Sequence, residues 1–261
     1  MTTQVLLKKS ENYVFNHYKT HFSILIFQKQ DDENQTKMMI EKYKIQPGTN
    51  APLPLKRFIQ LISLVSFNQI IINGLAQYAF YKLHVFLHDL RPQDIQKMPS
   101  FLRICGELLV FTLIEEIFFF YSHWALHSKY LYARFHKIHH EWTATVGLAA
   151  SYMHPLEYFI SDSIPNRVAP LLLASHPVTI WIWHFLANLY TINSHSGYHL
   201  PFLPSNENHD FHHKRFNVNY GSLGFLDAWH GTDASFKNSR EFLRHVTLKS
   251  WKSARELFPD D

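Results

Sequence analysis

Long apolar stretches alternate with short histidine-rich segments along this chain. Residues 58–81 (FIQLISLVSFNQIIINGLAQYAFY) carry no charged side chain over 24 residues, and about 20 apolar residues suffice to cross a bilayer as a helix. Residues 101–127 form a second apolar stretch, which Glu107, Glu115 and Glu116 interrupt. This pattern predicts long helices of membrane dimensions.

A third apolar region, residues 168–206, contains no Asp, Glu, Lys or Arg over 39 residues. Residues 175–177 (SHP) divide it, and because proline breaks a helix interior we expect two short helices joined by a turn. Trp181 and Trp183 suit a membrane interface. The alternative is a soluble helical protein that buries the same helices, and the mean hydropathy of -0.17 keeps that alternative open.

The composition fits a folded chain that is rich in aromatic residues and in histidine. With 22 Phe, 13 Tyr and 6 Trp in 261 residues, the sequence is unlike disordered proteins, which are poor in aromatic residues. Cys105 is the one cysteine, so no disulfide can form within the chain. The net charge of +4 is spread along the sequence and does not indicate nucleic-acid binding. The outlier is the number of histidines, which is 19.

Four short segments place histidines three or four positions apart. An α-helix turns once in 3.6 residues, so side chains at positions i, i+3 and i+4 share one face, with Cβ atoms about 5–6 Å apart. Imidazoles at that spacing can bind one metal ion at about 2.0–2.1 Å. HWALH and HSGYH have HxxxH spacing, and HKIHH and HDFHH have HxxHH spacing. The ten candidate ligands are His123, His127, His136, His139, His140, His195, His199, His209, His212 and His213.

The grouping of these segments is more specific than the spacing itself. HYKTH (residues 17–21) and HVFLH (residues 84–88) also have HxxxH spacing, and we interpret them as surface or interfacial histidines. Two HxxHH copies with two HxxxH pairs indicate a site for two metal ions. Imidazole suits Zn, Cu, Fe and Ni, and no HExxH motif of a zinc hydrolase is present. An all-histidine dinuclear site beside a membrane favours oxygen chemistry on a lipid.

The order of these motifs resembles that of the fatty acid hydroxylase superfamily, which includes C4-methylsterol oxidases, C5-sterol desaturases and sphingolipid hydroxylases. The segments HKIHHEWTA, YMHPLEY, HSGYHLPFLPS, HDFHHKRFNVNYG and LDAWHGTD are similar to its sterol-oxidising branch. The resemblance predicts a membrane domain over residues 55–250. Residues 1–54 are then a divergent N-terminal segment, and residues 251–261 are a C-terminal tail.

The resemblance implies an all-α fold of integral membrane helical hairpins with a cytosolic helical cap that holds a histidine-rich dimetal site. It implies two iron ions on the ten histidines, which zinc can replace in a purified sample, and O2 as a reactant. It also implies the endoplasmic reticulum membrane, with several spans, and electrons from a separate cytochrome b5 and its reductase. Basic residues near the histidine segments favour a cytosolic site by the positive-inside tendency; they are Lys129, Arg134, Lys137, Lys214 and Arg215.

The resulting prediction is a membrane-bound, non-haem diiron monooxygenase that oxidises a C–H bond of a sterol or related lipid. Three alternatives stay open: a desaturase or hydroxylase of another lipid, a non-catalytic relative that acts in lipid signalling, and a histidine-rich protein that handles metal ions. Glu116, two helical turns before His123, either orients an imidazole, faces a water-filled gap or pairs with Arg103. We expect Asp210 to face solvent, and His154 to lie near the site without binding metal.

Overall fold

The structure, a computed structural model, describes residues 39–89 and 96–260. The HYKTH segment and most of the divergent N-terminal segment lie outside the described residues. The chain divides into two compact units, residues 1–42 and residues 43–261. The description below concerns the second unit.

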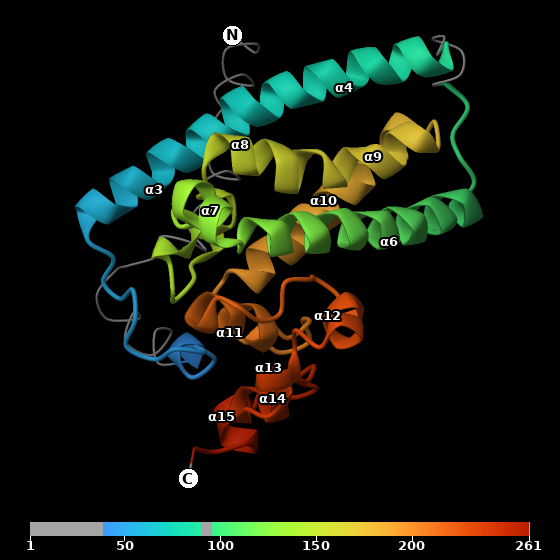
Figure 1. The fold of residues 1–261 in the computed structure, drawn as a ribbon. Helices are drawn as coiled ribbons and strands as arrows, with labels where there is room; N and C mark the ends of the chain where they lie inside the picture. Colours follow the sequence, from blue (N-terminus) through green and yellow to red (C-terminus); the bar gives the residue numbers. More distant parts are fainter. Residues whose placement is uncertain (1–38, 90–95, 261) are drawn as a thin grey trace, which may run out of the picture. The chain divides into compact units, whose positions relative to one another are not determined.

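The first apolar stretch forms one long helix that begins directly after Pro54. It comprises α3 (Leu55–Phe67), the short π-helix η1 (Asn68–Ile72) and α4 (Asn73–His88), which run on as a single rod of 34 residues (Figure 1). Most of its apolar side chains are exposed, as Phe86 is to 81%. Among the described residues it is the one helix long and apolar enough to cross a membrane, and it contains the predicted span at residues 58–81.

The second apolar stretch forms α6 (Phe101–Leu126), whose first turn is capped by Ser100. The Ser100 hydroxyl oxygen accepts a hydrogen bond from the backbone N–H of Arg103, which satisfies a donor that the first turn leaves without a helical partner. The third region forms two helices, α9 (Pro165–Leu172) and α10 (Pro177–Ser194), and so confirms the predicted break. Both helices pack against α6 (Figure 1), where Phe111 and Trp183 meet edge to face with ring centroids 5.8 Å apart.

Short helices connect the long helix, α6, α9 and α10 and follow them along the chain. They are α7 (Lys129–Leu131), η2 (Tyr132–His136), η3 (His139–Glu141), η4 (Gly147–Ser151), α8 (Pro155–Glu157), η5 (Tyr158–Ser163), α11 (Glu207–Arg215), α12 (Phe225–His230), α13 (Ala234–Lys237), α14 (Arg240–Arg244) and α15 (Ala254–Leu257). The described residues contain no β-strand, only an isolated bridge between Lys44 and Tyr198. The all-α prediction is confirmed for this part of the chain, and the membrane hairpins and cytosolic cap stay predictions.

Candidate metal centre

Nine of the ten candidate histidines converge in two adjoining groups. The five-histidine group consists of His123, His127, His136, His140 and His212, and the four-histidine group of His139, His195, His209 and His213. Within each group, the ring nitrogens that could bind a metal all lie within 4.8 Å of one another. The groups touch, since the ring centroids of His140 and His213 are 4.7 Å apart. Seven of the nine residues are buried, and His127 and His209 are half-buried.

Helix geometry explains how HDFHH contributes to both groups. Its three histidines lie on α11, where positions i and i+4 point the same way while position i+3 is rotated by about 100° from i+4. His209 and His213 therefore enter the four-histidine group, and His212 enters the five-histidine group.

Inside each group the Nε2 atoms face one another at metal-ligand spacing. Nε2 of His140 lies 2.9 Å from that of His136 and 3.2 Å from that of His212. In the four-histidine group the corresponding distances are 2.9, 3.2 and 3.3 Å. Two nitrogens bound to one metal at about 2.0–2.1 Å are about 2.9–3.4 Å apart for octahedral to tetrahedral angles. One neutral imidazole has a single N–H and cannot donate to several neighbours, so the arrangement fits a bound metal better than mutual hydrogen bonding.

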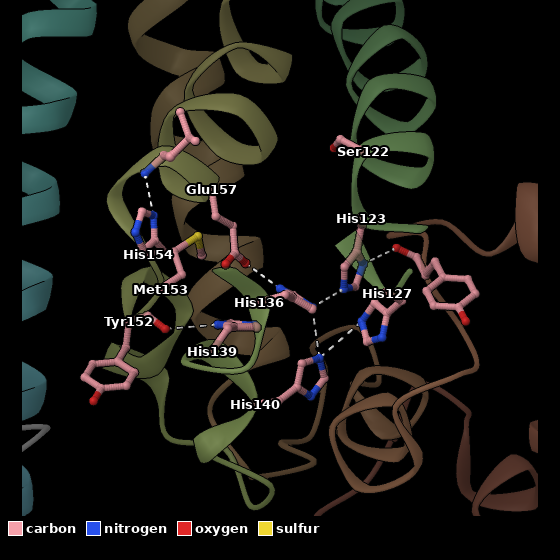
Figure 2. A network of polar contacts seen from close by, with 12 residues as sticks. Ser122, His123, His127, His136, His139, His140, Tyr152, Met153, His154 and Glu157 are labelled. Carbon is pink, nitrogen blue, oxygen red and sulfur yellow. Dashed lines mark hydrogen bonds and ion pairs between the residues drawn. The ribbon is translucent and has the colours of Figure 1, made fainter. Parts of the chain in front are cut away.

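The outer nitrogens of five of these rings meet oxygen acceptors, and Figure 2 shows the contacts of His136 with Glu157 and of His139 with Tyr152. Nδ1 of His136 donates to Oε1 of Glu157 at 2.5 Å, and Nδ1 of His123 donates to the Tyr220 carbonyl at 2.7 Å. Three further Nδ1 atoms donate to backbone carbonyls: His212 to Val218, His139 to Tyr152 and His195 to Thr191. Because the proton then sits on Nδ1, Nε2 is left as the bare nitrogen that a metal requires.

Burial keeps these imidazoles uncharged. It lowers the pKa of His139 to about 4 and the pKa of His195 to about 3. It also lowers the pKa of His140 and His213 well below the ordinary value. Neutral imidazole is the form that binds metal ions, so the folded chain presents both groups in the binding state at neutral pH.

Glu116 acts on His123 through a loop and does not contact the ring. Its Oε2 accepts the backbone N–H groups of residues 222 and 223 at 2.8 and 2.9 Å. The same loop carries the Tyr220 carbonyl that accepts from His123. The expected alternative, a pair with Arg103, does not form, because Arg103 pairs with Glu107 at 2.7 Å.

Gly221 lets the loop approach this carboxylate. A Cβ atom at Gly221 would lie 2.5 Å from Oε1 of Glu116 and 3.0 Å from Oδ2 of Asp227. Asp227 in turn accepts the backbone N–H of Gly221 at 2.8 Å. Because Gly221 has no side chain, the loop can lie close to Glu116 and Asp227. This position of the loop brings the Tyr220 carbonyl to His123.

The helical spacing predicted for HSGYH is wrong. His195 ends α10, and Gly197 then adopts φ +75°, a left-handed conformation that turns the chain out of the helix. A Cβ atom at Gly197 would also meet the Thr145 carbonyl at 2.6 Å. His199 consequently points away from both groups. Its Nδ1 lies 3.2 Å from Oε1 of Glu207 and its Nε2 lies 2.8 Å from the Val246 carbonyl, so oxygen acceptors occupy both nitrogens.

Sequence reasoning missed Glu157 and misplaced Asp210. Glu157 is 3% exposed and bonds to His136. Its one signal in the sequence was its place as the acidic residue of the YMHPLEY segment. Asp210 does not face solvent, since it is 3% exposed and accepts from Nε2 of Gln46 at 3.0 Å. His154 lies outside both groups, where its Nδ1 accepts the backbone N–H of Leu156.

A cavity of about 260 Å³ opens beside both groups. His123, His136, His139, His195 and His209 form one end of its wall. Much of the remaining wall is apolar and comes from α6 and α10, for example Leu108, Phe119, Trp183 and Leu186. Glu115, Glu157 and Asp162 add carboxyl groups to it. Both histidine groups thus face a space suited to a mainly apolar ligand.

These features define a class of protein, a helical protein in which paired all-histidine groups suited to metal ions adjoin an apolar cavity. A family model for fatty acid hydroxylases matches residues 108–232. The human fatty acid hydroxylase domain-containing protein 2 is 44% identical over 85% of this chain and 66% of its own length. A rice protein named very-long-chain aldehyde decarbonylase GL1-11 is 30% identical over 77% of this chain and 78% of its own length.

The chain belongs to the fatty acid hydroxylase family. Methylsterol monooxygenase 2-2 of Arabidopsis thaliana is also similar, with 28% identity over 80% of this chain and 81% of its own length. No solved structure matches the chain. The chain spans 66% of the length of the human relative. Its long apolar helix, together with this family, is typical of a membrane protein.

Proposed function

We propose that this chain is a membrane-bound, non-haem diiron monooxygenase that uses O2 to oxidise a C–H bond of a sterol, as a C4-methylsterol oxidase does, or of a related lipid. The observation that carries the proposal is the pair of histidine groups, whose Nε2 atoms face inward beside an apolar cavity. The similarity to a methylsterol monooxygenase supports the sterol. Bound iron would supply O2 activation and removal of the substrate hydrogen.

The chain's own residues would bind the metal ions, orient the ligand imidazoles and shield the site from water. Nine histidines form the proposed ligand set, and His199 is left out because both of its nitrogens bond to protein oxygens. Glu157 and backbone carbonyls orient the rings through Nδ1. Apolar side chains such as Phe119 and Trp183 would hold the lipid and exclude water.

The proposal places the enzyme in the endoplasmic reticulum membrane with its histidine groups on the cytosolic side. Lysines and arginines lie in or next to the histidine segments, as Lys137 and Lys214 do, and such residues are enriched on the cytosolic side. A separate cytochrome b5 with its reductase would supply the electrons. Several membrane spans are proposed, and the helix Leu55–His88 is one of them.

Sterol profiling by mass spectrometry tests this function. Host cells that lack their own C4-methylsterol oxidase would express the intact chain, its His139→Ala variant or its His199→Gln variant. We expect 4-methylsterols to fall with the intact chain and with His199→Gln, which lies outside the proposed ligand set, and to persist with His139→Ala.

Unchanged 4-methylsterols in cells with an iron-loaded, membrane-inserted chain would reject the sterol. Untargeted lipid profiling then separates the alternatives. A new hydroxylated or desaturated lipid that depends on His139 identifies another substrate, and an unchanged lipid profile identifies a non-catalytic relative.

A further inference from the structure

One wall of the cavity carries two buried oxygen atoms that the histidine groups do not use. Glu157 and Ser161 both line the cavity, lie four residues apart along α8 and η5, and are 3% and 6% exposed. Oε1 of Glu157 accepts from His136, whereas its Oε2 has no hydrogen-bond partner among the described residues. Oγ of Ser161 likewise has none there.

Buried polar atoms without partners are costly, and most in folded proteins are satisfied. Here the two atoms are chemically complementary to one kind of ligand group. A carboxylate oxygen accepts a hydrogen bond, and a serine hydroxyl can donate one. The wall thus offers a ligand hydroxyl an acceptor, Oε2 of Glu157, and a donor, Oγ of Ser161. A hydrocarbon could satisfy neither atom.

The position of Glu157 also indicates how close to the proposed metal site such a ligand hydroxyl would lie. Glu157 bonds directly to the ring of His136, which belongs to the five-histidine group (Figure 2). A hydroxyl held at Glu157 therefore lies one side chain away from the proposed metal site.

We propose that Glu157 and Ser161 anchor a hydroxyl group of the lipid substrate next to the carbon that is oxidised. The inference rests on the proposed function and narrows its substrate class to lipids with a hydroxyl on a carbon close to the reacting one. A 4-methylsterol has this arrangement, since its hydroxyl-bearing carbon is bonded to the carbon that carries the methyl group. Ser161 acts as a specificity-determining residue, and Glu157 both orients His136 and binds the substrate.

The Glu115 carboxyl of the wall is too remote for this role. Glu115 precedes His123 by eight residues on α6, which at the rise of an α-helix is about 12 Å along the axis. A group bound there would sit well away from the reacting carbon.

Equilibrium binding to the purified full-length chain in lipid nanodiscs tests the anchor without turnover. The probes are a radiolabelled 4,4-dimethylsterol with a free 3-hydroxyl and its 3-O-methyl ether, which cannot donate a hydrogen bond. A second pair is a long-chain 2-hydroxy acid and its 2-methoxy derivative. We expect the unmodified chain to prefer a free hydroxyl by about tenfold in Kd, and Ser161→Ala to reduce that preference to about threefold or less.

Ser163→Ala is the matched control. Ser163 lies on the same short helix, is fully buried and has an unpartnered Oγ among the described residues, but it does not line the cavity. It should keep the tenfold preference. Ser161→Ala should keep the iron content and the thermal unfolding midpoint of the unmodified chain, which excludes a merely structural effect.

Three results would overturn the anchor: no binding of either hydroxylated lipid, equal binding of the two members of a pair, or a preference that survives Ser161→Ala. Loss of the preference in Glu115→Gln alone would move the anchor to the remote Glu115 carboxyl and also reject it. A hydroxyl preference that depends on Ser161, combined with an unchanged lipid profile in cells, would leave the anchor standing and reject the proposed function.

Discussion

The two HxxHH copies have the same spacing but differ in backbone. HDFHH lies on the regular helix α11, whereas HKIHH runs through the end of η2, a turn and the start of η3. Each copy nevertheless sends its first and last histidines to one group and its middle histidine to the other. His136 and His140 enter the five-histidine group with His212 from the second copy, and His139 crosses to the four-histidine group.

Because each HxxHH copy supplies histidines to both groups, the two groups form one structural unit. His139 and His212 each leave their own copy and join the histidine pair of the other. The copies also differ in their outer support, because His136 is held by the side chain of Glu157 whereas His212 is held by the backbone carbonyl of Val218. A side-chain substitution at Glu157 therefore removes the acceptor of His136, whereas no side-chain substitution removes the backbone carbonyl that holds His212.

The crossing histidines should show the largest effects. His139→Ala leaves its group with three imidazoles, and His212→Ala leaves its group with four. We expect both variants to lose turnover and iron together, with the greater iron loss in His139→Ala. Elemental analysis by mass spectrometry, alongside the sterol assay, measures both. Either variant with full turnover and two irons would show that the groups do not form one site.

Glu157→Gln should have the second-largest effect, which is weaker iron binding through His136 of the first HxxHH copy. Loss of the carboxylate partner of a metal-binding histidine lowers metal affinity or activity by about 10- to 100-fold. Glu207→Gln is the matched control, because Glu207 makes the same kind of buried contact to His199, which is outside both groups. Chelator competition measures iron affinity in each variant. Equal losses in both would assign the effect to general destabilisation.

Acidification should destabilise the metal-stripped protein through both copies. Burial lowers the pKa of His139 from 6.5 to about 4, so the unfolded chain binds more protons than the folded chain between these values. The unfolded state gains relative stability as the pH falls through this window. The thermal midpoint should therefore drop between about pH 7 and about pH 5. A midpoint that stays constant across this range would mean that the imidazoles are not buried in the absence of metal.

His199→Gln should have the smallest effect on the metal and a modest effect on stability. The variant removes contacts to Glu207 and the Val246 carbonyl, and a buried group left without its partner costs about 1–3 kcal/mol. We expect two irons per chain and a lower thermal midpoint. Loss of one iron in this variant would indicate that His199 is a metal ligand.

Short-range sequence patterns predicted much of the helical structure. Pro177 predicted the start of α10, and the charge-free residues 58–81 predicted part of the long helix. Helical spacing anticipated that His209 and His213 meet, because positions i and i+4 share a face, but it did not anticipate that His212 joins the other group. The same rule failed for His199, because the close approach of Gly197 to the Thr145 carbonyl turns the chain out of the helix.

By itself the sequence determined the long apolar helices and the supply of histidines, since both depend on neighbours within a few residues. Only the tertiary structure decided how the histidines divide between the two groups, which oxygens hold their Nδ1 atoms, and where the cavity opens. Glu157 reaches His136 across 21 residues and Tyr220 reaches His123 across 97. Contacts of that range follow from how helices and irregular turns pack together, and no local periodicity encodes them.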